Sequence, residues 1–161
     1  MKLKANTLDP YWMPFTDNRG FKADPRLIVK GKGIYLWNHK GERLIDASSG
    51  LFCSALGHGR KEIADAVHEQ LLGLDFSAPF QLSHPWVFEL AQRVAQLTPD
   101  GLNRLFFTNS GSEAIDTALK ITMAYHRVIN EGHRTRFVSR ERAYHGVNIG
   151  GTSLSGLMKN R

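Results

Sequence analysis

The residues with the clearest chemical potential follow a short apolar run at 105–107, in the order Ser110, Gly111, Ser112 and Glu113. Ser110 and Glu113 have the spacing of a helix capping box, in which the serine hydroxyl accepts from the N–H of residue 113 and the glutamate reaches back. Ala, Leu and Ile then recur at helical spacing. The first N–H groups of a helix lack partners, and the helix dipole adds about half a positive charge there. This strand, turn and helix start therefore indicate a phosphate-binding cradle.

A purely structural role is the alternative for this turn. Many strand-to-helix turns contain Gly and Ser only to turn the chain and cap the helix, so spacing alone does not decide between the two roles. Gly111 would let a ligand approach the backbone closely, and Ser110 and Ser112 offer hydroxyl donors. The pattern matches neither G-x-x-x-x-G-K-[ST] nor G-x-G-x-x-G, so it does not indicate a nucleoside triphosphate or a dinucleotide.

The amino-acid composition and the net charge limit the classes of function that this chain could have. The 161 residues are 42% hydrophobic and 22% charged, as in soluble globular proteins. The net charge of +6 does not predict a nucleic-acid partner, because the basic residues are dispersed and their densest cluster, at 134–142, is interrupted by apolar and acidic side chains. The one cysteine, Cys53, forms no internal disulfide, and we expect it to be buried. No signal peptide, membrane span or metal site is evident, so the sequence predicts a cytoplasmic protein with no membrane partner.

The chain begins with segments that are not helical in pattern. Residues 1–25 predict an irregular arm whose large aromatic rings should be buried against some surface. Residues 27–48 contain short apolar runs split by Gly-containing turns, which is typical of an antiparallel meander. A glycine-rich loop at 48–59 follows and holds one bulky ring, Phe52.

Helices and strands are predicted from there on. The pattern predicts an amphipathic helix over 60–74, a helix that opens at Pro85, and a helix that ends near Asn130 with Gly132 as its C′ residue. The stretch 105–139 should run strand, helix, strand, which is the crossover unit of a mainly parallel sheet. Two strands do not complete a sheet covered on both faces, so we expect an α/β fragment with an unfinished sheet.

Two motifs, at 106–114 and 140–146, resemble those of the class III aminotransferases, which are fold-type-I enzymes dependent on pyridoxal 5′-phosphate (PLP). The likeness extends through the segments 11–16, 57–60 and 124–127. With these segments included, the chain is similar to the N-terminal part of the family members that transfer ω-amino groups to pyruvate. The resemblance implies a fold-type-I transferase with an incomplete, mainly parallel sheet, preceded by an arm and a meander.

The resemblance also implies a division into domains. Residues 1–58 correspond to the arm and antiparallel meander of the small domain. Residues 59–161 correspond to the first part of the large, cofactor-binding domain. The loop at 76–84 matches a segment that family dimers extend towards the partner's active site, so a homodimer or higher homo-oligomer is expected for a full-length protein.

The resemblance assigns cofactor-binding roles to residues of both motifs. Gly111 and Ser112 match the donors to the cofactor phosphate, and Ser110 lies beside them in the sequence. Tyr144 matches the aromatic residue that stacks on the pyridine ring, and His145 shapes the same turn. The alternative for Tyr144 is a core tyrosine with a satisfied hydroxyl. The two motifs follow consecutive predicted strands, where open α/β sheets bind ligands.

Two aromatic residues match the substrate pocket of the family. Phe52 occupies a position where members often carry Trp, so the wall remains aromatic but changes size and loses an N–H donor. Phe15 matches a second aromatic wall. The implied reaction moves an amino group from an ω-amino acid or amine, such as β-alanine, to a keto acid such as pyruvate.

The catalytic residues of the family are not matched in this chain. The Schiff-base lysine, and the aspartate that faces the pyridine nitrogen, lie beyond residue 161 in full-length members. The chain by itself is therefore predicted to be inactive and to supply cofactor binding only. Two alternatives stay open, namely a truncated, catalytically inactive fragment and a binding domain for a phosphate ligand other than PLP.

Overall fold

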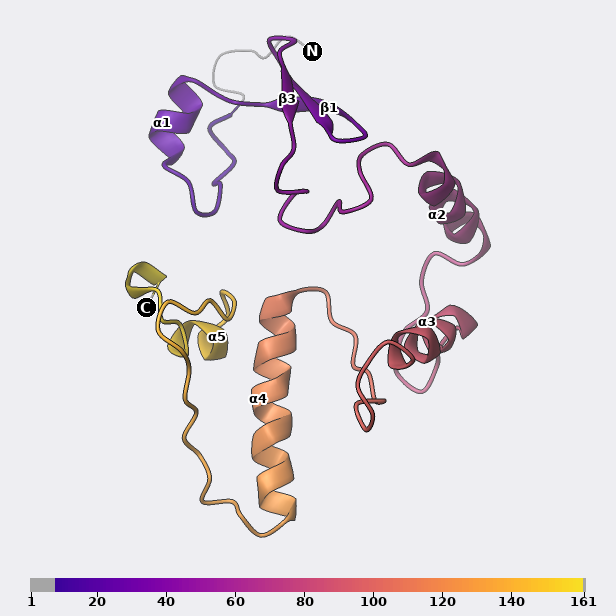
Figure 1. Ribbon diagram of the computed structural model, residues 1–161, viewed down its shortest axis with the longest axis vertical. Coiled ribbons are helices and arrows are strands. Elements are labelled where there is room, and N and C mark those ends of the chain that lie inside the picture. Colours follow the sequence, from indigo (N-terminus) through magenta and orange to yellow (C-terminus); the bar gives the residue numbers. More distant parts are fainter. Residues whose placement is uncertain (1–7, 161) are drawn as a thin grey trace. The chain divides into compact units, whose positions relative to one another are not determined.

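The computed structural model describes residues 8–160. The chain divides into two compact units, with the boundary between Leu82 and Ser83. The first unit contains α1 to α2 and a small sheet, and the second contains α3 to the C-terminal 3-10 turn (Figure 1). The boundary expected between residues 58 and 59 divides the small domain from the large domain of the family fold. This boundary stays a prediction.

The first unit is built around a three-stranded antiparallel sheet. Its strands are β1 (Ile28–Lys32), β2 (Tyr35–Asn38) and β3 (Arg43–Ile45), in the order β1-β2-β3. Leu36 at the centre of β2 pairs with Gly31 on one side and with Leu44 on the other. The meander predicted over 27–48 is confirmed, because its Gly-containing turns separate the three strands.

Two helices flank this sheet in the sequence. α1 (Asn18–Ala23) lies in the arm, where no helix was expected, and Asp17 caps it by accepting from the N–H of Gly20 at 3.2 Å. α1 is only six residues long, so its sequence shows no apolar periodicity from which a helix could be predicted. α2 (Lys61–Gly73) agrees with the amphipathic helix predicted over 60–74.

The second unit begins with two longer helices. α3 (Pro85–Ala95) has its proline in the first turn, as predicted. α4 (Gly111–Val128) begins directly after Ser110. A short α5 (Ile149–Ser153) and the 3-10 turn Met158–Asn160 follow.

The C-terminal end of α4 differs from the prediction. Asn130, not Gly132, adopts the left-handed conformation, with φ 63°. The N–H of Glu131 donates to the carbonyl of His126 at 2.7 Å, and the N–H of Asn130 donates to that of Arg127 at 3.2 Å. These two bonds form a Schellman motif, in which asparagine is the usual substitute for glycine because it tolerates this conformation.

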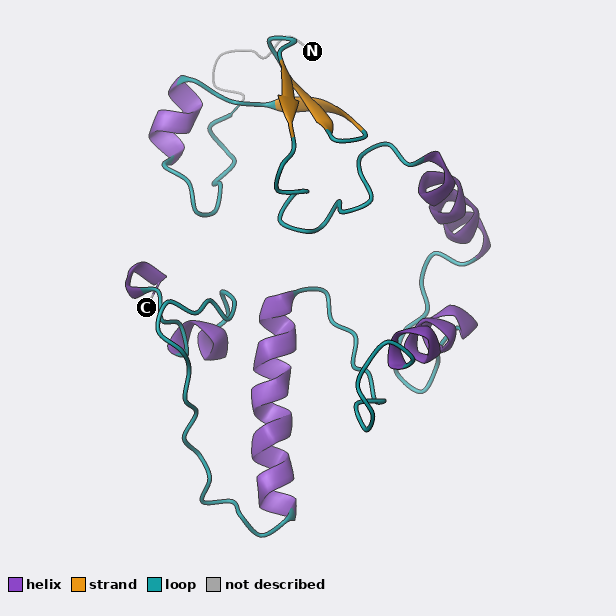
Figure 2. Ribbon diagram, viewed as in Figure 1, coloured by secondary structure: helices purple, strands orange, loops and turns teal. Residues whose placement is uncertain are grey.

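The parallel strands predicted at 105–107 and 136–139 are not formed among the described residues. Both segments are drawn as loop, and the antiparallel meander is the sheet that the described residues contain (Figure 2). A strand is held by hydrogen bonds to a neighbour, and these two segments find none in residues 8–160. Both segments contain residues that favour strands, but residues 8–160 do not contain the neighbouring strands with which they would pair.

Within residues 8–160, no hydrophobic side chain is fully buried, and the one fully buried polar side chain is Ser155, at 1% exposure. The aromatic rings at 11–15 in the arm, expected to be buried, are exposed, with Trp12 at 85%, whereas Phe21 is half-buried. Cys53, also expected to be buried, is exposed. Such extensive apolar exposure is unusual for a stable monomer and indicates surfaces that normally pack against further polypeptide. None of the described helices is both long enough and apolar enough to span a bilayer.

Candidate functional site

The start of α4 is capped largely as its sequence predicts. The hydroxyl of Ser110 accepts from the N–H of Glu113 at 3.1 Å. The Glu113 carboxylate accepts from the N–H of Asn109 at 3.0 Å, one residue before the position that a standard capping box uses. These two bonds fix the entry of the chain into the helix, so the direction of its first turn is well defined.

Two backbone donors remain free at this helix start. The N–H of Glu113 donates to Ser110, and that of Ala114 donates to the Ser110 carbonyl at 3.0 Å. Within the described part of the chain, the N–H groups of Gly111 and Ser112 have no acceptor. A Cβ on Gly111 would have no neighbouring heavy atom within 4 Å, so the space beside it is open. The site offers two donors at the positive end of an 18-residue helix.

The second predicted motif lies against this helix start. A hollow of about 250 Å³ is lined from both motifs by Gly111, Ser112, Ile115, Tyr144, His145 and Gly146. Four of the five predicted cofactor residues thus share one hollow, although more than 30 residues separate Ser112 from Tyr144 in the sequence.

A hydrogen bond and a close backbone contact hold the two motifs together. The N–H of Val147 donates to the hydroxyl oxygen of Ser112 at 2.9 Å. A Cβ on Gly146 would lie 2.7 Å from Cα of Ser112, and Gly146 has a φ of 109° that disfavours other residues. Since the Ser112 oxygen accepts here, its own hydrogen stays available to donate to a ligand.

α5 fastens the same loop to α4 one turn further along. The N–H of Gly151 donates to the Asp116 carboxylate at 3.0 Å, and a Cβ on Gly150 would lie 2.7 Å from the same carboxylate oxygen. A Cβ on Gly151 would collide with the carbonyl of His145. The sequence interpretation missed Asp116, and the Gly-Gly pair at 150–151 is the signal that could have indicated this close packing.

The chemistry of the hollow fits a flat phosphorylated ligand. The free N–H groups of Gly111 and Ser112 and the Ser112 hydroxyl are donors suited to a phosphate. Tyr144 is 53% exposed and offers an aromatic ring at the rim. His145 contributes a buried ring nitrogen, Nε2, that has no hydrogen-bond partner among the described residues.

Three predicted site residues lie outside this hollow. Ser110 does not line it, because its hydroxyl caps α4. Phe15 and Phe52 belong to the first unit, where they are 76% and 89% exposed. Both have left-handed backbones, with φ of 52° and 72°. Their assignment to a substrate pocket stays a prediction.

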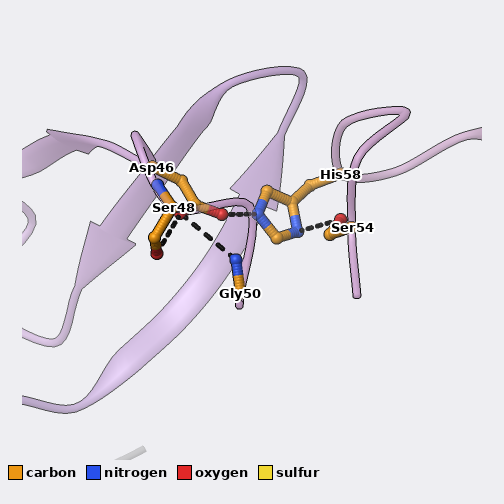
Figure 3. A network of polar contacts seen from close by, with 5 residues as sticks. All are labelled: Asp46, Ser48, Gly50, Ser54 and His58. Atoms are coloured by element: carbon orange, nitrogen blue, oxygen red, sulfur yellow. Dashed lines mark hydrogen bonds and ion pairs between the residues drawn. The ribbon is translucent and has the colours of Figure 1, made fainter. Parts of the chain in front are cut away.

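The first unit contains a polar network that the sequence interpretation missed. Nε2 of His58 lies 2.8 Å from a carboxylate oxygen of Asp46, and the other ring nitrogen lies 3.3 Å from the hydroxyl oxygen of Ser54 (Figure 3). The hydrogen bond from His58, opposed by burial and aided by Ser48 and Gly50, lowers the pKa of Asp46. Asp46 and His58 are 12 residues apart and follow no periodic pattern, so only the glycines on either side of His58 mark it.

Among residues 8–160, no group of three or more His, Cys, Asp or Glu side chains is placed to hold a metal ion.

Sequence comparisons place the chain among aminotransferases. The family model for aminotransferase class-III matches residues 18–160. The chain is 49% identical over 157 residues to an omega-aminotransferase of Caulobacter vibrioides, covering 98% of this chain and 36% of that protein. It is 50% identical over 154 residues to an omega-amino acid–pyruvate aminotransferase of Pseudomonas putida, covering 96% and 34%. The chain spans about a third of the length of these relatives.

Solved structures agree with these matches. An omega transaminase from Pseudomonas jessenii in complex with PMP aligns with a TM-score of 0.91 at 33% identity, covering 96% of this chain and 34% of that one. An (S)-enantioselective omega-transaminase from Thermomicrobium roseum aligns with a TM-score of 0.91 at 34% identity, covering 95% and 35%. The expected fold class, part of a fold-type-I PLP-dependent transferase, is confirmed. The chain belongs to the class-III aminotransferase family.

Proposed function

We propose that this chain is the cofactor-phosphate and ring-binding part of a PLP-dependent transaminase. The observation that carries the proposal is the shared hollow at the start of α4, where Gly111 and Ser112 meet Tyr144 and His145. A phosphate held there would satisfy two free N–H groups at the positive end of the helix.

Four of the residues that line the hollow have a stated task in this proposal. The N–H groups of Gly111 and Ser112, with the Ser112 hydroxyl, bind the phosphate. Tyr144 orients the cofactor by stacking on its ring, and His145 shapes the turn that carries Tyr144. Bound PLP supplies the electron sink that amino-group transfer needs. The base of the reaction is supplied by residues outside this chain.

The substrate proposal rests on the relatives. The protein from Pseudomonas putida is named an omega-amino acid–pyruvate aminotransferase, and one from Pseudomonas aeruginosa, 48% identical, a beta-alanine–pyruvate aminotransferase. We therefore propose an ω-amino acid or amine such as β-alanine as donor and a keto acid such as pyruvate as acceptor. Phe52 and Phe15 form aromatic walls for the donor. A homodimer and a cytoplasmic location remain part of the proposal.

The test uses the complete polypeptide that contains these residues, incubated with PLP, β-alanine and pyruvate. We expect yellow absorbance from bound cofactor and formation of alanine, detected by chromatography. Phosphate-dependent ligand binding without yellow absorbance would favour the alternative of a different phosphate-binding domain. The 161-residue chain alone should form no alanine, and turnover by it would contradict the placement of the base elsewhere.

A further inference from the structure

The loop between β3 and α2 has an unusual backbone. Four consecutive residues, Ser49, Gly50, Leu51 and Phe52, have positive φ angles of 50°, 59°, 57° and 72°. Gly50 accepts this conformation readily, but the other three are disfavoured in it by contact between Cβ and the backbone. Non-glycine residues keep such a conformation only where the surrounding structure enforces it, and they cluster at functional sites.

One carboxylate holds the start of this loop. Oδ1 of Asp46 accepts from the N–H and the hydroxyl of Ser48, both at 3.2 Å, and from the N–H of Gly50 at 3.4 Å. Oδ2 of the same carboxylate lies 2.8 Å from Nε2 of His58 (Figure 3). The Asp46 side chain is only 7% exposed, and its contact with His58 is partly buried, whereas its bonds to Ser48 and Gly50 lie at the surface.

His58 holds the end of the loop. Its backbone pairs with Gly33 in both directions, at 2.9 and 2.8 Å, and so joins the turn between β1 and β2. Its ring lies against β1, because a Cβ on Gly31 would be 2.8 Å from Cγ of His58. Nδ1 of the ring lies 3.3 Å from the Ser54 hydroxyl inside the loop. The Asp46–His58 pair therefore fastens both ends of the loop to the sheet.

We propose that Asp46 and His58 are positioning residues for recognition of the amine donor, acting through Phe52. The pair holds both ends of the loop that contains the left-handed run, and backbone bonds from the N–H of Phe52 to Ser48 and from the N–H of Ser54 to Ser49 close the run itself. The ring of Phe52 is 89% exposed and so is free to contact a ligand. A large apolar ring held on an enforced backbone loses little entropy when it packs against the apolar part of a donor. This inference rests on the proposed function, in which Phe52 is a wall of the donor pocket.

The experiment compares variants of the complete polypeptide loaded with PLP. Asp46→Asn keeps an acceptor for Ser48 and Gly50 but removes the charge that faces His58. We expect it to raise KM for the amine donor about tenfold with kcat and the dissociation constant of PLP within about twofold of wild type. Chymotryptic cleavage at Leu51 and Phe52, mapped by mass spectrometry, should become about tenfold faster.

A double-mutant cycle separates positioning from general stability. If the pair acts through Phe52, Asp46→Asn should change KM by less than about twofold when Phe52→Ala is already present. Asp65→Asn is the matched control, because that carboxylate pairs with Lys61 on the exposed surface of α2. It should leave KM and cleavage unchanged.

The possible results distinguish this inference from the proposed function. Unchanged KM, unchanged cleavage or additive effects in a PLP-binding protein would overturn the positioning role and leave the proposed function standing. A complete polypeptide that binds no PLP would overturn the proposed function itself. Asp46→Ala serves as a second variant, and its effect on KM should exceed that of Asp46→Asn, because it also removes the acceptors for Ser48 and Gly50.

Discussion

The hydroxyl oxygen of Ser112 lies 2.9 Å from the backbone nitrogen of Val147 and accepts its hydrogen bond. This bond joins the first turn of α4 to the loop that carries Tyr144. The residue that offers a hydroxyl to the candidate phosphate site therefore also fixes the ring at its rim. Binding of the phosphate and orientation of the ring should consequently respond together to changes at this contact.

Gly146→Ala should disrupt this contact. The added Cβ would lie 2.7 Å from Cα of Ser112, and alanine disfavours the φ of 109° at this position. We expect the free energy of unfolding to fall by about 1–3 kcal/mol, measured by urea denaturation of the complete polypeptide. Gly73→Ala is the control, because its Cβ would meet no atom within 4 Å at the end of α2. If Gly73→Ala lowered the free energy of unfolding as much as Gly146→Ala, the close-contact explanation would be contradicted.

Tyr144→Ala should weaken retention of PLP. An aromatic stack contributes about 0.5–1.5 kcal/mol, so the dissociation constant should rise by up to about tenfold, while Tyr144→Phe should keep most of the affinity. Equilibrium dialysis with absorbance detection measures the constant. Tyr125→Ala is the matched control, because Tyr125 is 58% exposed on α4 but does not line the hollow. An unchanged constant in Tyr144→Ala would refute the stacking role.

Asp116→Ala should loosen α5 from α4. The Asp116 carboxylate accepts from the N–H of Gly151 at 3.0 Å, and its removal leaves that half-buried donor unpaired. We expect a loss of about 1–3 kcal/mol and faster hydrogen exchange at the Gly151 amide. Asp116→Asn keeps a carbonyl acceptor and should lose less. Equal losses in the two variants would show that the hydrogen bond is not what holds the helices together.

Acid should release the loop that ends at His58. The hydrogen bond from His58 lowers the pKa of Asp46, so the carboxylate is more acidic in the folded protein than in the unfolded one. Its contribution to stability is therefore complete above the ordinary carboxyl pKa and is lost as the pH falls through the lowered value, below about pH 4. Chymotryptic cleavage is too slow to follow there, so pepsin cleavage of residues 48–57 between about pH 4 and 2 measures it.

The control for this pH dependence is Asp46→Asn. Its loop should be cleaved rapidly across the whole range, with a weaker dependence on pH than in wild type. The carboxylate of Glu62, whose pKa is lowered by Arg60, is present in both proteins and adds the same background. Identical pH profiles in the two proteins would show that another group controls the loop.

Local signals in the sequence predicted the local structure well. Ser110 and Glu113 indicated the start of α4, Pro85 indicated the start of α3, and the Gly-containing turns indicated the meander. Each of these features depends on residues close together in the chain, so its physical cause is visible in the sequence. The end of α4 was misplaced because asparagine and glycine both suit a C′ residue, and Asn130 comes first.

Features that depend on residues far apart in the sequence were harder to predict. The strands expected at 105–107 and 136–139 need neighbours that residues 8–160 do not provide. The pairing of Asp46 with His58 and of Asp116 with Gly151 joins residues without a common periodicity. Such contacts arise only once the elements have packed. Resemblance to the family, and not spacing, brought Gly111 and Tyr144 into one predicted site.

The most direct test of the proposed phosphate site is a crystal structure of the complete polypeptide with bound PLP. We expect phosphate oxygens about 2.7–3.2 Å from the backbone nitrogens of Gly111 and Ser112, with the cofactor ring stacked on Tyr144. A phosphate bound away from the start of α4, or a cofactor ring that makes no contact with Tyr144, would contradict the proposed site.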